Sequence, residues 1–259
     1  MGVFLGMVLS SGVSGGHLNP ALTLAMATVG KVSWRRVPHY LLGQYLGACL
    51  GAALVFFVYW DGLVFFEHQQ GLYRSIPDTA SIFSSFPSAH LSVLGGAGDQ
   101  VLSTALLSLL LCSLTDHPGL SSSPLTRPAV VSLSVLALGT SLGFNCGFPL
   151  NPARDLGPRI FLGKERSTDQ SYNEDMLTIT ALSGWGLEVF TGYSHWWIVP
   201  LLACHLGGLL GALLYFLLLR PEAEEAGKED VMREARPEKM ATGTFLHVRV
   251  LIVMERLLN

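Results

Sequence analysis

The sequence predicts an all-α membrane protein built from two inverted repeats. Half of the 259 residues are hydrophobic and only 14% are charged, whereas soluble proteins carry about a quarter charged residues. The phrase Asn-Pro-Ala occurs twice, at 19–21 and at 151–153. Each copy lies next to apolar stretches of membrane-spanning length. The two copies therefore mark corresponding points in two halves of one membrane domain.

Six apolar segments make up this domain. Four of them reach the roughly 20 helical residues that cross a bilayer. These four are 38–60, 97–115, 128–147 and 196–219. Two shorter stretches, about 20–30 and 152–162, follow the Asn-Pro-Ala phrases and are too short to span the bilayer at about 1.5 Å per residue. Short segments at corresponding positions of two halves indicate re-entrant half-helices that line a path at the midplane.

The spanning segments repeat as well. Residues 46–56 resemble 206–216, and both stretches carry two glycines four positions apart, a spacing that lets membrane helices pack closely. These glycines are Gly47 and Gly51, and Gly207 and Gly211. An odd number of spanning segments separates the two Asn-Pro-Ala copies, so the two halves must be inverted relative to each other.

The two halves are unequal in length. Only 18 residues precede Asn19, whereas two spanning segments of the second half precede Asn151. We therefore expect the first transmembrane helix to be missing from this chain. A signal peptide is the alternative interpretation of the apolar start, but no basic leader precedes it. The expected organisation is a channel-like domain at 1–220, with a first repeat at 1–60, a second repeat at 97–220 and a polar insertion at about 162–180, and a disordered tail at 221–259.

Basic residues in short loops predict the orientation. Lys31, Arg35 and Arg36 lie just before the first spanning segment, while the loop at 61–96 has one arginine among several acidic residues. The first loop is expected inside and the second outside. This orientation places the C-terminal tail in the cytoplasm.

The residue types of the Asn-Pro-Ala phrases suit the start of a helix. Pro20 and Pro152 suit the first turn of a helix, and Asn19 and Asn151 suit the cap that accepts from the next turn. Two such helix starts that meet inside the membrane present two amide donors and two positive dipole ends. Such a site binds a neutral oxygen and repels cations, protons included. The alternative is that each Asn-Pro opens an ordinary turn.

Arg154 lies one turn past Asn151, where it is expected to project into the lumen and hold a hydroxyl or water oxygen. An interfacial arginine whose side chain reaches the membrane surface is the alternative. Asp155 and Arg159 are expected to form a structural ion pair that holds the second short helix.

At these residues the chain resembles the aquaporin family, and within it the aquaglyceroporins. The residues that carry the likeness are Asp155 after Asn-Pro-Ala-Arg, the phrase with Phe86, Pro87 and His90, Asp99-Gln100, and Gly184-Trp185-Gly186. The resemblance implies an aquaporin-like right-handed bundle and a homotetramer with a pore in each subunit. It also implies that glycerol, water and urea are the solutes and that the lipid bilayer is the surrounding medium.

The resemblance also implies a selectivity filter. Gly139 stands where water-selective relatives have a histidine, which would leave the filter wide, and Phe148 would form its aromatic wall. Backbone carbonyls of non-helical loops survive at membrane depth where they line a cavity, and those of Gly16, His17, Leu18, Gly147 and Phe148 are candidates. The His17 ring is an alternative anchor for its loop. Pore support is expected from Pro20, Ala21, Pro152, Ala153, Asp155, Gln44 and Gln100, the two glutamines holding the re-entrant loops.

Three functions fit the sequence. The first is a passive channel for glycerol and water, and the second is a truncated subunit that no longer conducts. The third is an ion-coupled transporter, for which Asp99 and Asp155 are the candidate carboxylates. No constellation for an enzyme, a metal or a cofactor occurs, and the net charge of −3 gives no reason to expect nucleic acid. The plasma membrane is the expected location.

Overall fold

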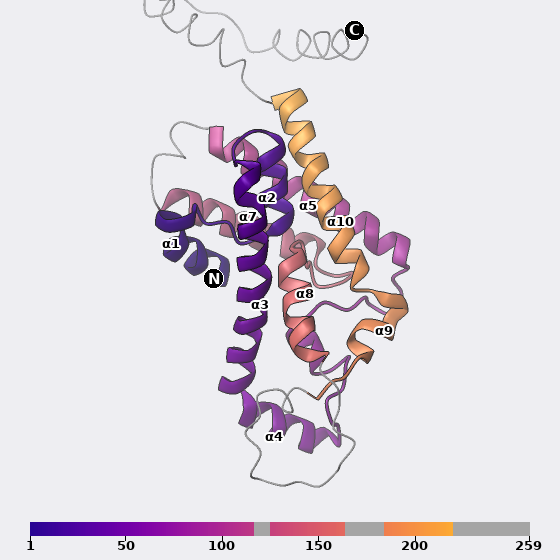
Figure 1. The fold of residues 1–259 in the computed structure, drawn as a ribbon. Coiled ribbons are helices and arrows are strands. Elements are labelled where there is room, and N and C mark those ends of the chain that lie inside the picture. Colours follow the sequence, from indigo (N-terminus) through magenta and orange to yellow (C-terminus); the bar gives the residue numbers. More distant parts are fainter. Residues whose placement is uncertain (117–124, 164–183, 220–259) are drawn as a thin grey trace, which may run out of the picture.

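The computed structural model describes residues 1–116, 125–163 and 184–219, and every regular element in these ranges is helical. Most of the predicted insertion and the predicted tail lie outside the described residues. The elements are α1 (Gly2–Ser14), α2 (Pro20–Thr28), η1 (Trp34–Arg36), α3 (Val37–Val58), α4 (Trp60–Gln70), η2 (Ala80–Ile82), α5 (Val93–Asp116), α7 (Thr126–Leu142), α8 (Pro152–Leu162), α9 (Glu188–His195), α10 (Ile198–Leu214) and the π-helical η3 (Tyr215–Leu219). Figure 1 shows these helices as one bundle.

Among the described residues, three helical stretches are long and apolar enough to cross a membrane, namely η1 with α3, α5, and α10 with η3. The predicted fourth span at 128–147 is wrong at its end, because α7 stops at Leu142 after 17 residues. The chain turns there into the loop before the second Asn-Pro-Ala. Gly147 and Phe148 have φ of 72° and 44°, values that no α-helix contains.

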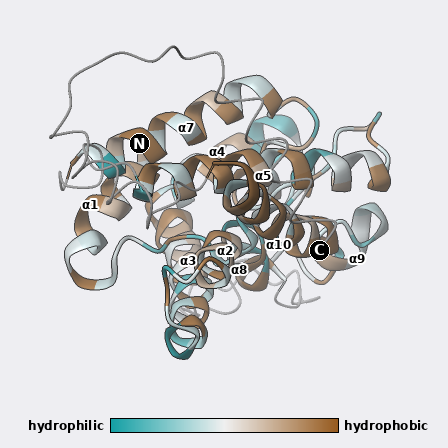
Figure 2. Ribbon diagram, turned by 90° about the horizontal axis from the view of Figure 1, so that it is seen from above, coloured by the Kyte–Doolittle hydropathy of each residue, from teal (hydrophilic) through white to brown (hydrophobic). Residues whose placement is uncertain are grey.

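The two half-helices are α2, with nine residues, and α8, with eleven. They reach only about 14 Å and 17 Å along their axes. The long helix after one half-helix packs on the other half-helix. The helix α3, which comes after α2, packs chiefly on α8, and α10, which comes after α8 and α9, packs on α5 and α2. Viewed from above, α2 and α8 lie between α3 and α10 (Figure 2). This exchange of partners is the arrangement that inverted repeats predict.

Glycines allow these contacts to be close. A Cβ on Gly157 of α8 would lie 3.0 Å from the carbonyl oxygen of Tyr45 in α3. A Cβ on Gly208 of α10 would lie 2.8 Å from the carbonyl oxygen of Ala21 in α2. Larger side chains at either position would push a half-helix away from its supporting helix.

The two predicted glycine pairs behave differently. A Cβ on Gly211 would lie 2.9 Å from the Cα of Ala105, and Gly207 is equally close to the α5 backbone, so this pair does bring α10 against α5. For Gly47 and Gly51, a Cβ would meet nothing within 4 Å among the described residues, so the structure shows no close helix at this pair. Among the described residues no element packs on that face of α3 in the way that α5 packs on α10.

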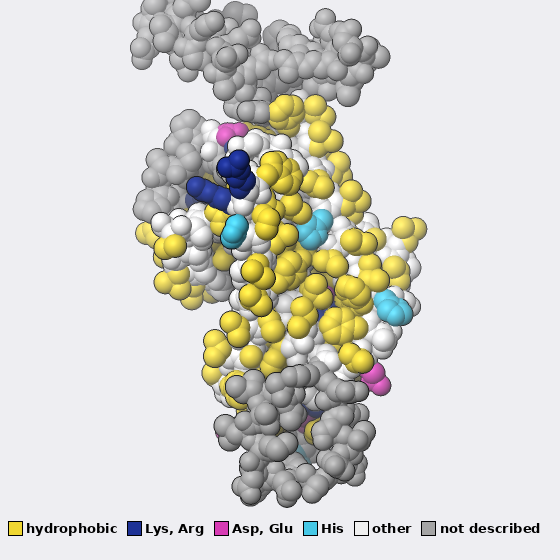
Figure 3. Space-filling view, in the orientation of Figure 1, with side chains coloured by type: hydrophobic (Ala, Val, Ile, Leu, Met, Phe, Trp, Pro, Cys, Tyr) yellow, Lys and Arg dark blue, Asp and Glu magenta, His cyan; other side chains and the backbone are white. Residues whose placement is uncertain are grey.

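Apolar side chains dominate the visible face of the bundle over α3 and α10, and the Lys and Arg side chains seen there gather toward one end (Figure 3). At that end Lys31, which follows α2, forms an ion pair with Asp116 at the end of α5, and the Tyr215 hydroxyl donates to the same carboxylate. This end carries the basic loop from which the sequence predicts the inner side.

Candidate pore site

The N-termini of the two half-helices are capped as predicted. Asn19 has extended φ and ψ of −143° and 117°, and its side-chain oxygen accepts from the Ala21 amide at 3.0 Å. Asn151 has nearly the same conformation, and its oxygen accepts from the amides of Ala153 at 3.0 Å and Arg154 at 3.3 Å. A proline fills the first turn of each helix, where its missing N–H costs nothing.

The two caps also bind each other's loops. The Asn19 amide nitrogen donates to the Leu150 carbonyl at 2.8 Å, and the Asn151 amide nitrogen donates to the Leu18 carbonyl at 2.8 Å. Each bond joins residues more than 130 positions apart in the sequence. Because an amide group has two N–H bonds, one donor of each asparagine remains for a solute. The reciprocal bonds hold the two positive helix ends against each other.

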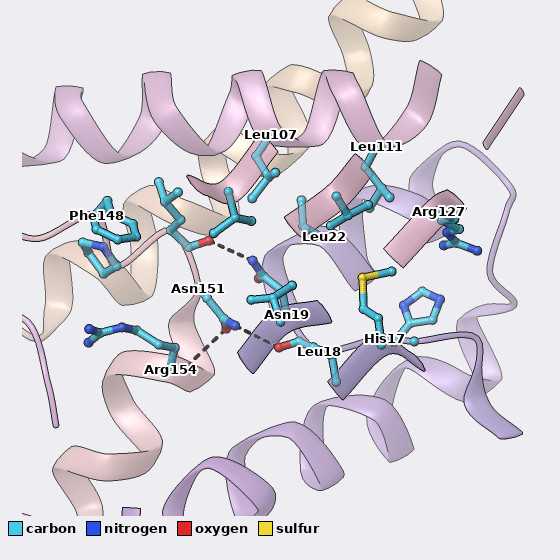
Figure 4. Close-up of a pocket in the computed structure, with 17 residues that line it drawn as sticks. His17, Leu18, Asn19, Leu22, Leu107, Leu111, Arg127, Phe148, Asn151 and Arg154 are labelled. Atoms are coloured by element: carbon cyan, nitrogen blue, oxygen red, sulfur yellow. Dashed lines mark hydrogen bonds between the residues drawn. The ribbon is translucent and has the colours of Figure 1, made fainter. Parts of the chain in front are cut away.

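A cavity of about 200 Å³ lies at this junction. Figure 4 shows Arg154 and Phe148 on one side of it, Asn19 and Asn151 in the middle, and His17 and Arg127 on the other side. The predicted site residues that line it are Gly16, His17, Leu18, Asn19, Phe148, Asn151 and Arg154. Gly139 and Gly147 are not among the residues that line the cavity.

The remaining lining residues were missed by the sequence analysis. Apart from Arg127 they are mostly apolar, and they come largely from α1, α5 and α7: Val3, Met7, Leu22, Leu107, Leu111, Val131, Val135, Pro149 and Leu150. The spacing of these residues in the sequence could have indicated that they line a common surface. Residues 107 and 111, and residues 127, 131 and 135, are four positions apart and therefore share one face of their helices.

Gly139 makes room for the ring of Phe148. A Cβ on Gly139 would lie 2.8 Å from two ring carbons of Phe148 and 3.0 Å from a third. One turn later, a Cβ on Gly143 would lie 2.9 Å from the same ring. The Phe148 ring therefore lies against both glycines.

The first loop is held by side chains of α2 and α3. The His17 ring stacks on Tyr40 with centroids 4.6 Å apart, and its Nδ1 lies 3.1 Å from the Thr23 hydroxyl. Gln44 Nε2 donates to the His17 carbonyl at 3.1 Å and to the Thr23 hydroxyl at 2.9 Å. The ring therefore has the contacts of an anchor, while the His17 carbonyl keeps one lone pair beyond the bond from Gln44.

Gln100 has the corresponding place in the second half. It is fully buried, and its Oε1 accepts from the Leu150 amide at 3.0 Å. Its Nε2 donates to the neighbouring Asp99 carboxylate at 3.0 Å and to Cys146 Sγ at 3.1 Å. Gln100 thus fixes Leu150, whose φ of 50° is strained for a residue with a side chain.

Asp155 and Arg159 form the expected ion pair on α8. Both are buried, with Arg159 Nη2 and Asp155 Oδ2 3.1 Å apart. The carboxylate also accepts from the amide and hydroxyl of Ser85, at 2.7 Å and 2.6 Å. Neither side chain lines the cavity, so the pair joins the second half-helix to the loop that contains Ser85.

The charged groups that border the cavity are all of positive sign. Arg154 and Arg127 line it, the two half-helices point their positive ends at it, and none of its lining residues is acidic. Its surface is otherwise mainly apolar. The cavity thus offers hydrogen-bond donors and an apolar surface to a small neutral solute.

Fold and site together define a membrane channel built on two re-entrant half-helices. The major intrinsic protein family matches residues 1–215. The chain therefore belongs to the major intrinsic protein family.

Individual relatives agree with this assignment. Human aquaporin-9 is 36% identical over 242 residues, which cover 92% of this chain and 76% of the relative. Human aquaporin-10 is also 36% identical, over 245 residues that cover 93% and 75%. The X-ray structure of the aquaglyceroporin from Plasmodium falciparum is similar with a TM-score of 0.69 and 25% identity, covering 86% of this chain and 80% of that one. The resemblance to aquaglyceroporins is confirmed, and these likenesses support a passive channel for water and small solutes.

Proposed function

We propose that this chain forms a passive channel for glycerol and water, with urea as a further solute, and that it excludes ions and protons. The observation that carries the proposal is the pair of reciprocal bonds from Asn19 and Asn151, which fix two positive helix ends around one cavity. At one end of this cavity Arg154 offers hydrogen-bond donors and the Phe148 ring offers an apolar wall. Glycerol has both kinds of surface.

The environment of the carboxylates argues against ion-coupled transport. Asp155 is occupied by Arg159 and Ser85. Asp99 accepts from Gln100, and neither carboxylate lines the cavity. A coupling site needs a carboxylate that meets the transported ion.

We propose further that the channel is a homotetramer of the plasma membrane with a cytoplasmic C-terminus. The proposed division is a channel domain at 1–220, made of repeats at 1–60 and 97–220 with an insertion at about 162–180, and a tail at 221–259. The family resemblance supports the assembly, and the basic loop before α3 supports the orientation.

Stopped-flow light scattering of proteoliposomes tests the proposal. Vesicles shrunk in glycerol should swell again quickly, while vesicles shrunk in sorbitol should stay small. Leu107→Trp fills the cavity from α5 and should abolish the glycerol phase, whereas Leu106→Trp, at a 40% exposed neighbour, should leave it intact. Glycerol swelling no faster than that of empty liposomes, in a chain that is folded, would favour a subunit that does not conduct.

A further inference from the structure

Arg127 is the second charged residue that lines the cavity, besides Arg154. It is the second residue of α7 and lines the cavity on the side of His17, across the two asparagines from Arg154 (Figure 4). Because α7 begins shortly after Asp116, which pairs with Lys31, Arg127 lies at the inner end. The cavity thus has one guanidinium at each end.

Arg127 lies on the face of α7 that lines the cavity. Arg127, Val131 and Val135 are four positions apart on α7, and all three line the cavity. The facing residues Val3 and Met7 of α1 are apolar. No acidic side chain lines the cavity, so the wall offers the guanidinium no carboxylate.

One donor of Arg127 has no partner. Its Nε is buried, and it makes no hydrogen bond within the described parts of the chain. An arginine stays charged at any physiological pH, and a buried donor without a partner is costly. The most direct way to satisfy this donor is an oxygen atom of a molecule inside the cavity.

We propose that Arg127 is a second solute-binding residue, which holds hydroxyl oxygens of a small neutral polyol at the inner end of the pore. The forked donors suit two neighbouring hydroxyls. Val131 and Val135 on the same helix face, with Leu107 and Leu111 of α5, offer apolar surface to the carbon edge of the solute. A solute that leaves the asparagine pair then meets Arg127, which offers the same kind of donors that Arg154 offers on the other side. This inference rests on the proposed function and names a specificity-determining residue for it.

The first test measures glycerol flux in proteoliposomes of the full chain against glycerol concentration. Arg127→Met should raise the half-saturating glycerol concentration at least about fivefold, since a hydrogen bond to a charged group is lost, and should change water permeability less than about twofold. Arg127→Lys keeps the charge without the fork, so its half-saturating glycerol concentration should lie between those of the wild type and Arg127→Met. The control is Arg36→Met, which removes the same charge from an exposed residue at the inner end. Unchanged half-saturation in Arg127→Met would overturn the inference.

The second test needs no conduction. A ligand that binds the native state raises the unfolding temperature, so glycerol should stabilise the detergent-solubilised wild type more than Arg127→Met. Sorbitol at equal osmolality corrects for the general effect of a polyol solution. A larger glycerol shift in the wild type, in a chain that shows no flux, would sink the proposed function and keep the Arg127 site. Equal shifts in both proteins would reject the site whether or not the chain conducts.

Discussion

Gly139→Ala tests whether Phe148 depends on the glycine beneath its ring. The added Cβ would lie 2.8 Å from two ring carbons, whereas carbon atoms in favourable contact lie about 3.5 to 4.0 Å apart. The ring must therefore shift by roughly 1 Å. Phe148 is 37% exposed and lines the cavity, so the ring has room to move toward the pore. We expect a cost of about 1 to 3 kcal/mol in unfolding free energy and a narrower passage.

Two measurements check this prediction. Glycerol and water permeabilities of proteoliposomes report the passage, and we expect glycerol permeability to fall more than water permeability because glycerol is the wider molecule. Denaturation in mixed micelles reports the unfolding free energy. The matched control is Gly98→Ala on α5, where a Cβ meets nothing within 4 Å, and both permeabilities should stay near those of the wild type.

A double variant tests whether the stability lost in Gly139→Ala comes from the Phe148 ring. Gly139→Ala combined with Phe148→Leu should recover most of the lost stability, because contacting residues show coupling of about 0.5 to 3 kcal/mol. If the two substitutions are additive, or if Gly139→Ala lowers water and glycerol permeability equally, the Phe148 ring is not the element that Gly139 accommodates.

Three further predictions follow from the site. Asp155→Asn leaves the buried Arg159 without its counter-charge and should cost about 3 to 5 kcal/mol in mixed-micelle denaturation, an effect that unchanged stability would contradict. Gln100→Leu removes the acceptor of the Leu150 amide and should cost about 1 to 3 kcal/mol by the same measurement, while a neutral result would show that the loop is held elsewhere. Arg154→Ala removes a positive charge from the cavity and should raise sodium conductance in planar bilayers, and a conductance equal to that of the wild type would show that this charge is no barrier.

Local chemistry explains why the half-helices could be predicted from the sequence. Asparagine at a cap and proline in the first turn act within one helical turn, and both helices begin where these residues stand. The ion pair of Asp155 with Arg159 lies within one turn as well. Such features depend on neighbours in the sequence and need no tertiary information.

The rest depended on contacts between distant segments. The bond from Asn19 to the Leu150 carbonyl spans 131 positions, and no local rule predicts which loop an amide will face. Gly47 and Gly207 share a sequence pattern, yet in the described part of the chain a helix lies against Gly207 and none lies against Gly47. Arg127 shares its helix face with Val131 and Val135, but only the fold shows that this face borders the cavity.

The most direct test of the central claim is glycerol uptake into proteoliposomes under imposed ion gradients. A passive channel predicts that glycerol enters until the two concentrations are equal, at the same rate whether sodium or proton gradients point inward, point outward or are absent. The cavity has no acidic lining residue to couple an ion. Accumulation of glycerol above the external concentration, or uptake that changes with the direction of either gradient, would contradict the account.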